Sequence, residues 1–108
     1  MVLAGMEKKK PHYALGEIQS ALGDAAKLNR TVTAADGAAD LGLDDEDVAS
    51  VVRHLARKDF YKSMTAYHDN RLWQDVYRPT VAGKELYVKF TKDALGNFLL
   101  ISFKDSES

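Results

Sequence analysis

The fold of this 108-residue chain is decided by residues 60–79, which read FYKSMTAYHDNRLWQDVYRP. Two aromatic-rich, alternating segments, residues 60–67 and 72–78, flank the polar tetrad HDNR. This arrangement is typical of a β-hairpin with the tetrad as its turn. Lys62 and Gln74 stand among apolar neighbours, one in each predicted strand. A lysine and an amide held on strands in such surroundings indicate a functional site.

The residues before this hairpin have the apolar spacing of helices. A stripe of apolar side chains over residues 15–28 predicts one helix that ends near Asn29. Residues 31–33 are expected to form an extended link or, at most, an edge strand. An alanine-rich helical segment over residues 34–41 follows and ends at Gly42.

A further helix is predicted to begin after Asp44, which has the side chain of an N-cap. The next three residues are acids, and the helix dipole favours carboxylates in a first turn. The apolar stripe of this helix, which is expected to face the core, consists of Val48, Val51, Val52 and Leu55.

After Asp59 the apolar period changes from about 3.6 residues to about two, which indicates strands. Residues 85–90 and 97–104 are predicted to form two strands beyond the hairpin. Helices followed by an antiparallel meander imply an α+β fold in which N-terminal helices pack on one face of an antiparallel β-sheet.

The composition is that of an ordinary globular chain, with 45% apolar and 29% charged residues. Its length predicts a single domain, residues 1–108, with a mobile lead-in at residues 1–10 and a flexible tail at residues 105–108. The absence of cysteine excludes disulfides, thiolate chemistry and a cysteine-based zinc site. No apolar run approaches the roughly 20 residues of a membrane-spanning helix, so the expected location is the cytoplasm, without a membrane partner.

The net charge of −1 gives no global sign of nucleic-acid binding, but the charges are unevenly distributed. Residues 36–47 hold six acids and no base. Residues 60–104 hold seven Lys or Arg against four acids, a net of +3. The C-terminal half therefore permits a basic face that the overall total conceals.

Strand alternation assigns side chains to the two faces of the predicted sheet. The apolar sets expected to meet the helices are Leu86, Val88 and Phe90 in one strand and Leu99, Ile101 and Phe103 in the last. The hairpin register stays open, because both of its faces are mixed. One face carries Phe60, Lys62, Met64, Leu72, Gln74, Val76 and Arg78, and the other carries Tyr61, Ser63, Thr65, Tyr67, Trp73, Asp75 and Tyr77.

One of the two registers gathers polar side chains that suit an anionic ligand. If the Lys62 face is open, the converging residues are Lys62, Gln74, Arg78, Tyr87 and Lys104. Cations, a phenol and an amide, without a carboxylate pair, suit a ligand with phosphates and stacking bases, such as RNA. The ordinary alternative is a solvated face, because surface lysines usually aid solubility or protect a sheet edge. Trp73, Tyr77 and Tyr61 are likewise more often cross-strand packing residues.

Other kinds of site have little support. His12, His54 and His68 fall in a linker, a helix and a turn, without metal-ligand spacing. The acids at residues 44–47 are explained as a helix start. No glycine-rich phosphate loop and no Ser-His-Asp arrangement is found, so we expect neither a metal nor a cofactor.

Residues 60–79 closely resemble the motif of the motility quorum-sensing regulator (MqsR) toxins, and the resemblance covers nearly the whole chain from Met6. It continues through ELYVK at residues 85–89 and LISFK at residues 100–104. The resemblance implies a type II toxin with a RelE-like ribonuclease fold, which cuts single-stranded mRNA without the ribosome at GCU-like sequences. It also implies a cognate MqsA-like antitoxin with a zinc-binding domain and a helix-turn-helix domain. The resemblance implies Lys62, Gln74 and Tyr87 as catalytic residues, with Met64, Arg78 and Lys104 nearby. Together with Lys89, which alternation places on the same face as Tyr87, these nearby residues are expected to bind the substrate.

A metal-free mechanism needs a base for the 2′-hydroxyl, charge stabilisation at phosphorus and an acid for the 5′-oxygen. We expect Tyr87 to act as the acid, with Lys62 and either Lys104 or Arg78 neutralising the phosphate and Gln74 orienting the reacting groups. Alternatively, Lys62 is the base, if burial lowers its pKa. The products would be a 2′,3′-cyclic phosphate and a 5′-hydroxyl.

Two other functions remain open at this point. The same basic, aromatic face suits a translational regulator that binds RNA without cutting it. An exposed strand edge suits a module that pairs with a protein partner.

Overall fold

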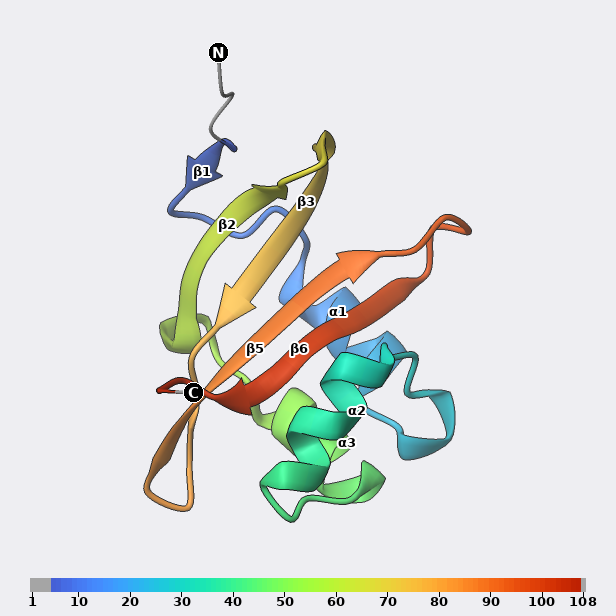
Figure 1. Cartoon of the computed structure of the whole chain (residues 1–108), viewed down its shortest axis with the longest axis vertical. Helices are drawn as coiled ribbons and strands as arrows, with labels where there is room; N and C mark the ends of the chain where they lie inside the picture. Colours follow the sequence, from blue (N-terminus) through green and yellow to red (C-terminus); the bar gives the residue numbers. More distant parts are fainter. Residues whose placement is uncertain (1–4, 108) are drawn as a thin grey trace.

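The structure, a computed structural model, describes residues 5–107. Three helices pack on one face of an antiparallel sheet, which confirms the predicted α+β fold (Figure 1). The helical elements are α1 (Leu15–Leu22), η1 (Ala25–Lys27), α2 (Val32–Asp40), α3 (Asp45–His54) and η2 (Arg57–Asp59). The strands are β1 (Glu7–Lys8), β2 (Phe60–Ala66), β3 (Asp69–Tyr77), β4 (Thr80–Val81), β5 (Lys84–Lys92) and β6 (Phe98–Asp105).

The strands follow the order β1-β2-β3-β5, and both β6 and the two-residue β4 pair with β5. The helices gather beside β5 and β6, while β1 and the tip of the β2–β3 hairpin extend away from them (Figure 1). One face of the hairpin is therefore left without a helical cover. In the part of the chain that the structure describes, no helix is both long and apolar enough to cross a membrane.

Helix α1 is shorter than predicted, because it ends at Leu22 and not near Asn29. The next residue, Gly23, lies so close to α3 that an added Cβ would come within 2.8 Å of the Arg53 side chain. Asp24 then starts the separate 3₁₀ turn η1, and its carboxylate accepts a hydrogen bond from the Ala26 N–H. The two short helical pieces replace one long helix because this contact and this cap interrupt it.

The predicted link at residues 31–33 is wrong, because α2 begins at Val32. The Thr31 hydroxyl accepts a hydrogen bond from the Ala34 N–H, and this cap starts the helix. Near its centre, α2 lies directly on β6 at Gly37, where a Cβ would come within 2.0 Å of the Phe103 carbonyl oxygen. No larger residue fits at this contact.

Helix α3 follows the prediction. The Asp44 carboxylate accepts from the Asp47 N–H at 2.8 Å, and the Asp47 carboxylate accepts from the Asp44 N–H at 3.0 Å. This reciprocal capping box satisfies two backbone donors that a helix start otherwise leaves open. The predicted stripe is buried and forms the helix side of the core, with Val48, Val51, Val52 and Leu55.

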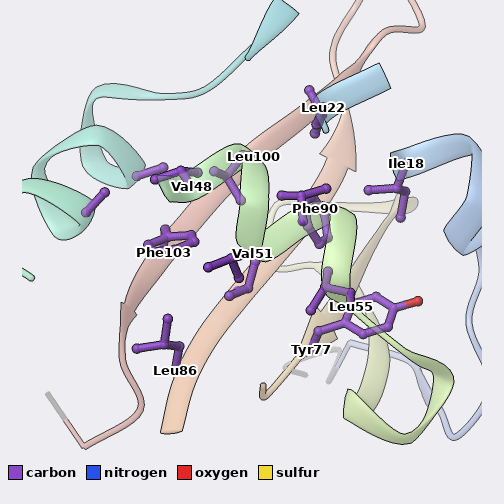
Figure 2. Packing of buried hydrophobic residues seen from close by; sticks show 14 of the residues in the cluster. Ile18, Leu22, Val48, Val51, Leu55, Tyr77, Leu86, Phe90, Leu100 and Phe103 are labelled. Atoms are coloured by element: carbon purple, nitrogen blue, oxygen red, sulfur yellow. The ribbon is translucent and has the colours of Figure 1, made fainter. Parts of the chain in front are cut away.

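The core lies between the helices and one face of the sheet (Figure 2). Its helix side includes Ile18 and Leu22 from α1, and these face large side chains of the sheet. The sheet side consists of Tyr77, Leu86, Val88, Phe90, Phe98, Leu100 and Phe103. The assignment of β5 is thus confirmed, but that of β6 is wrong in its first half. Phe98 and Leu100 are buried, because a register shift opposite Lys89 and Phe90 reverses the alternation.

The hairpin turn is tighter than predicted. Tyr67 and His68 form it, and β3 already begins at Asp69. Ala66 pairs with Asp69, whereas Thr65 pairs with Trp73, so a bulge takes up Asn70, Arg71 and Leu72.

The two ends of the described chain are ordered by contacts with the sheet. Within the predicted lead-in, Glu7 and Lys8 form β1, which pairs with Met64 and Ser63 of β2. At the other end Asp105 is the last residue of β6, and the prediction that the tail begins there is wrong. Residues 1–4 and 108 of the predicted lead-in and tail lie outside the described residues.

Candidate functional site

The register settles which face of the hairpin is open. Ser63 and Asp75 are opposite one another and fully buried, whereas Lys62 and Gln74 point to the side away from the helices. On that side Val76 pairs with Lys89 of β5, and Tyr87 of β5 pairs with Lys104 of β6. We call this side the open face; it carries Lys62, Met64, Gln74, Arg78, Tyr87, Lys89 and Lys104.

Two aromatic residues of β2 exchange faces relative to the prediction, because a bulge lies between Phe60 and Lys62. Phe60 packs edge-on against Tyr77 of the core, with ring centroids 5.5 Å apart. Tyr61 joins the open face instead, where its ring lies 4.8 Å from the guanidinium of Arg78 and 5.4 Å from Nζ of Lys62. Simple alternation cannot reveal a bulge, so the sequence missed Tyr61.

The opposite face of the hairpin is fixed by Asp75, whose carboxylate is fully buried. It accepts hydrogen bonds from the Ser63 hydroxyl at 2.6 Å and from the backbone N–H groups of His12 and Tyr13 at 3.2 and 2.9 Å. The hairpin is thereby attached to the segment that leads into α1. Trp73 lies under this segment, stacked on His12 at 5.1 Å, so packing is its role.

Lys62 forms an ion pair that the sequence analysis did not anticipate. Its Nζ donates to Oε1 of Glu7 at 2.5 Å, and Glu7 is brought there by β1. The hydrogen bond from Lys62 to Glu7 raises the pKa of the lysine. The hypothesis that burial lowers the Lys62 pKa is therefore wrong, because the acid partner outweighs desolvation.

Tyr87 of β5 has two lysine side chains close to its ring. The Nζ atoms of Lys104 and Lys89 lie 5.5 and 5.8 Å from its ring centroid. Burial raises the pKa of the Tyr87 phenol, so the hydroxyl keeps its proton at neutral pH. Burial, together with the charges of Lys104 and Lys62, lowers the pKa of Lys89.

Arg78 is tied to the open face from two sides. Its guanidinium pairs with the Glu85 carboxylate at 3.0 Å and lies over the Tyr61 ring. Its Nε is buried and has no hydrogen-bond partner among the described residues. An anionic ligand that reaches Arg78 therefore has to compete with Glu85.

A hollow of about 580 Å³ lies on the open face beside β1. It is lined by Gly5, Met6, Glu7, Met64, Thr65, Tyr67, Gln74 and Lys89. Met64, Gln74 and Lys89 belong to the predicted site, whereas Gly5, Met6 and Glu7 do not. Among residues 5–107, no group of three or more His, Cys, Asp or Glu side chains is arranged to hold a metal ion.

Residues 10–105 match the model of one protein family, described as motility quorum-sensing regulator, toxin of MqsA. The chain belongs to this family. It is also similar to the mRNA interferase toxin MqsR of Escherichia coli (strain K12), with 40% identity over 100 residues, 93% of this chain and 99% of that protein. The matched span of the motility quorum-sensing regulator family includes all the predicted catalytic and substrate-binding positions, whereas Glu7 precedes it.

Proposed function

We propose that this protein is the toxin of a type II toxin–antitoxin pair and cleaves mRNA without the ribosome. Its family is one of toxins, and its E. coli relative is named an mRNA interferase. The observation that carries the proposal is the open face, where β2, β3, β5 and β6 bring together Lys62, Gln74, Tyr87 and Lys104. Cations beside a phenol and an amide suit the charge and the proton transfers of phosphodiester cleavage.

The cleavage uses the 2′-hydroxyl of the substrate as the nucleophile. Lys62 and Lys104 neutralise the charge that develops on the phosphorane, and Gln74 orients it by hydrogen bonds. Tyr87, whose phenol is protonated at neutral pH, donates its proton to the leaving 5′-oxygen. The products are a 2′,3′-cyclic phosphate and a 5′-hydroxyl, and no metal takes part.

The substrate is a single strand with GCU-like cleavage sites. Unpaired bases can stack on an aromatic ring, and Tyr61 is exposed next to Arg78 on the open face. Met64, Arg78 and Lys89 contact the substrate on either side of the reacting phosphate. The RelE-like fold implied by the resemblance is compatible with helices on one sheet face and a substrate on the other.

The partner that silences the toxin is an MqsA-like antitoxin with a zinc-binding domain and a helix-turn-helix domain, and both act in the cytoplasm. The family description names the toxin by this antitoxin, which supports the pairing.

Cleavage of a defined RNA by the purified protein, with analysis of the fragment ends, tests the proposal. We expect wild-type protein to cut a GCU-containing RNA in EDTA and to leave cyclic-phosphate ends. Tyr87→Phe is expected to slow cleavage by about 100-fold or more, because it removes the general acid. Lys62→Ala and Gln74→Ala are expected to suppress cleavage as well.

RNA binding without cleavage by the wild-type protein would instead support a non-catalytic regulator. Undiminished activity of all three variants would contradict the assigned site. Loss of wild-type activity in EDTA would contradict the metal-free mechanism.

A further inference from the structure

The proposed cleavage still lacks a group that removes the proton from the 2′-hydroxyl. We propose that Glu7, carried by β1 to within hydrogen-bond distance of Lys62, is this general base. The inference rests on the proposed ribonuclease function and names the one reacting group that function leaves unassigned.

The sheet register places Glu7 in the site. Glu7 is opposite Met64 of β2, which is in turn opposite Gln74 of β3. Side chains at directly opposite positions share a face, so these three form a row across the open face. Lys62 is the diagonal neighbour of Glu7, and their side chains meet at 2.5 Å. The carboxylate therefore stands beside Lys62, which is proposed to neutralise the phosphate, and on the same face as Gln74.

Space for a nucleotide exists beside the carboxylate. The hollow of about 580 Å³ is lined by Glu7, Gln74 and Lys89, and its size is typical of small-ligand pockets. The Glu7 side chain is 52% exposed, whereas that of Lys62 is 21% exposed. A ribose placed in the hollow can thus bring its 2′-hydroxyl to the carboxylate without displacing the strand.

The strand that carries Glu7 is held in place on both sides. Before it, the Met6 N–H donates to the Thr65 hydroxyl, and the Thr65 N–H donates to the Met6 carbonyl, each at 2.9 Å. After it, Asp75 holds the backbone of His12 and Tyr13. A reactive group on an anchored strand is positioned more accurately than one on a free segment.

The protonation states favour Glu7 over Lys62 and Tyr87 as the base. The hydrogen bond from Lys62 lowers the Glu7 pKa, so the carboxylate is ionised at neutral pH and free to accept a proton. The same pair raises the pKa of Lys62. A lysine with a pKa near 10.4 is neutral in only about one molecule in 2,500 at pH 7, and Lys62 is neutral less often still. Lys62 is thus a poor base, and Tyr87 keeps its proton for the leaving group.

The step balances without a further reactant. An oxygen of Glu7 takes the proton of the 2′-hydroxyl while the 2′-oxygen forms a bond to phosphorus. The bond from phosphorus to the 5′-oxygen breaks, and Tyr87 gives its proton to that oxygen. Exchange with water then returns a proton from Glu7 to Tyr87.

Glu85 provides a matched control, because it is a second carboxylate on the open face, paired with Arg78. Glu85 is opposite Thr80 of β4 and is not among the residues that line the hollow. Glu7→Gln and Glu85→Gln make the same change in charge and leave a side chain that accepts a hydrogen bond from the neighbouring cation.

The test is single-turnover cleavage of a GCU-containing RNA by the full-length protein between pH 4 and pH 9. We expect Glu7→Gln to lower the rate by about 100-fold or more, Glu7→Asp to restore part of it, and Glu85→Gln to change it by only a few-fold. Binding of the same oligonucleotide with a 2′-deoxyribose at the cut site should change little in Glu7→Gln. The wild-type rate should level off above about pH 5, since its base is already ionised there.

Glu7→Gln activity equal to wild type, or reduced no more than in Glu85→Gln, would overturn the assignment. A wild-type rate that rises tenfold per pH unit from pH 7 to pH 9 would overturn it too, and would point to Lys89 as the base. If the wild-type protein cuts no RNA at all, the proposed function itself fails, and the role of Glu7 with it.

Discussion

On each face of the β2–β3 hairpin, one carboxylate links the hairpin to the N-terminal segment, and the two carboxylates have opposite surroundings. Asp75 is fully buried and receives three hydrogen bonds. Glu7 is half-exposed and is bound to a single lysine. The Asp75 carboxylate uses its hydrogen-bond acceptor capacity within the fold. The Glu7 carboxylate keeps acceptor capacity for a ligand.

This difference shows where the hairpin provides stability and where it provides reactivity. On the helix side, the Asp75 carboxylate is held by hydrogen bonds and apolar side chains pack together. On the open face Lys62, Lys89 and Lys104 stand near one another, and the charges of the other two help to lower the pKa of Lys89. Mutual repulsion of this kind costs stability and is retained where a site needs positive charge.

The largest expected effect comes from removing the buried carboxylate. Asp75→Ala leaves the buried Ser63 hydroxyl and the partly buried N–H groups of His12 and Tyr13 without their acceptor, and an unpaired buried group costs roughly 1–3 kcal/mol. We expect a loss of about 3 kcal/mol or more in the free energy of unfolding, measured with urea, and a smaller loss for Asp75→Asn. A loss below about 1 kcal/mol for Asp75→Ala would show that this face is not the anchor described above.

The sequence predicted the parts of the molecule that local chemistry determines. Asp44 caps α3 as expected, because a capping box involves residues only three apart. The exposed set on β5 was also correct, because Tyr87 and Lys89 alternate with the buried Leu86 and Val88 without interruption.

The parts that the sequence did not predict depend on distant contacts or on bulges. Strand β1 has two residues and no pattern of its own, and it forms because β2 and Asp75 hold its neighbours. For this reason Glu7 was not among the site residues predicted from the sequence. The bulge after Phe60 moves Tyr61 to the open face, and the shift in β6 buries Phe98. A single extra residue moves every side chain beyond it to the opposite face of the sheet. Strict alternation in the sequence therefore assigns these side chains to the wrong face.

A smaller effect is expected from the pH dependence of the pair between Glu7 and Lys62. The folded pKa of Glu7 is lowered, so its contribution to stability is present above its unfolded pKa and is lost as the pH falls through the folded value. The folded pKa of Lys62 is raised, so its contribution is present below its unfolded pKa and is lost as the pH rises through the folded value. At pH 7, wild-type protein should therefore unfold at a higher urea concentration than Glu7→Gln. The difference between their unfolding midpoints should shrink at pH 3. The same difference should be absent at both pH values in a Lys62→Met background; a difference that persists there would mean that Glu7 acts on stability through another partner.

The smallest effect is expected at Tyr77, on the helix side of the hairpin, where the change from Tyr to Phe can be compared with the same change at Tyr87. The Tyr77 side chain lies in the core below Leu55 (Figure 2), and its hydroxyl is buried without a hydrogen-bond partner among the described residues. Burial raises the pKa of this phenol to about 12. Because Tyr77→Phe removes a desolvated polar atom and keeps the ring, we expect the free energy of unfolding to stay the same or to rise by up to about 1 kcal/mol. Cleavage of RNA should be unchanged, in contrast to the loss expected for Tyr87→Phe. Destabilisation by more than about 1 kcal/mol would mean that the Tyr77 hydroxyl has a partner, such as a buried water, and that the helix side also contains a polar site.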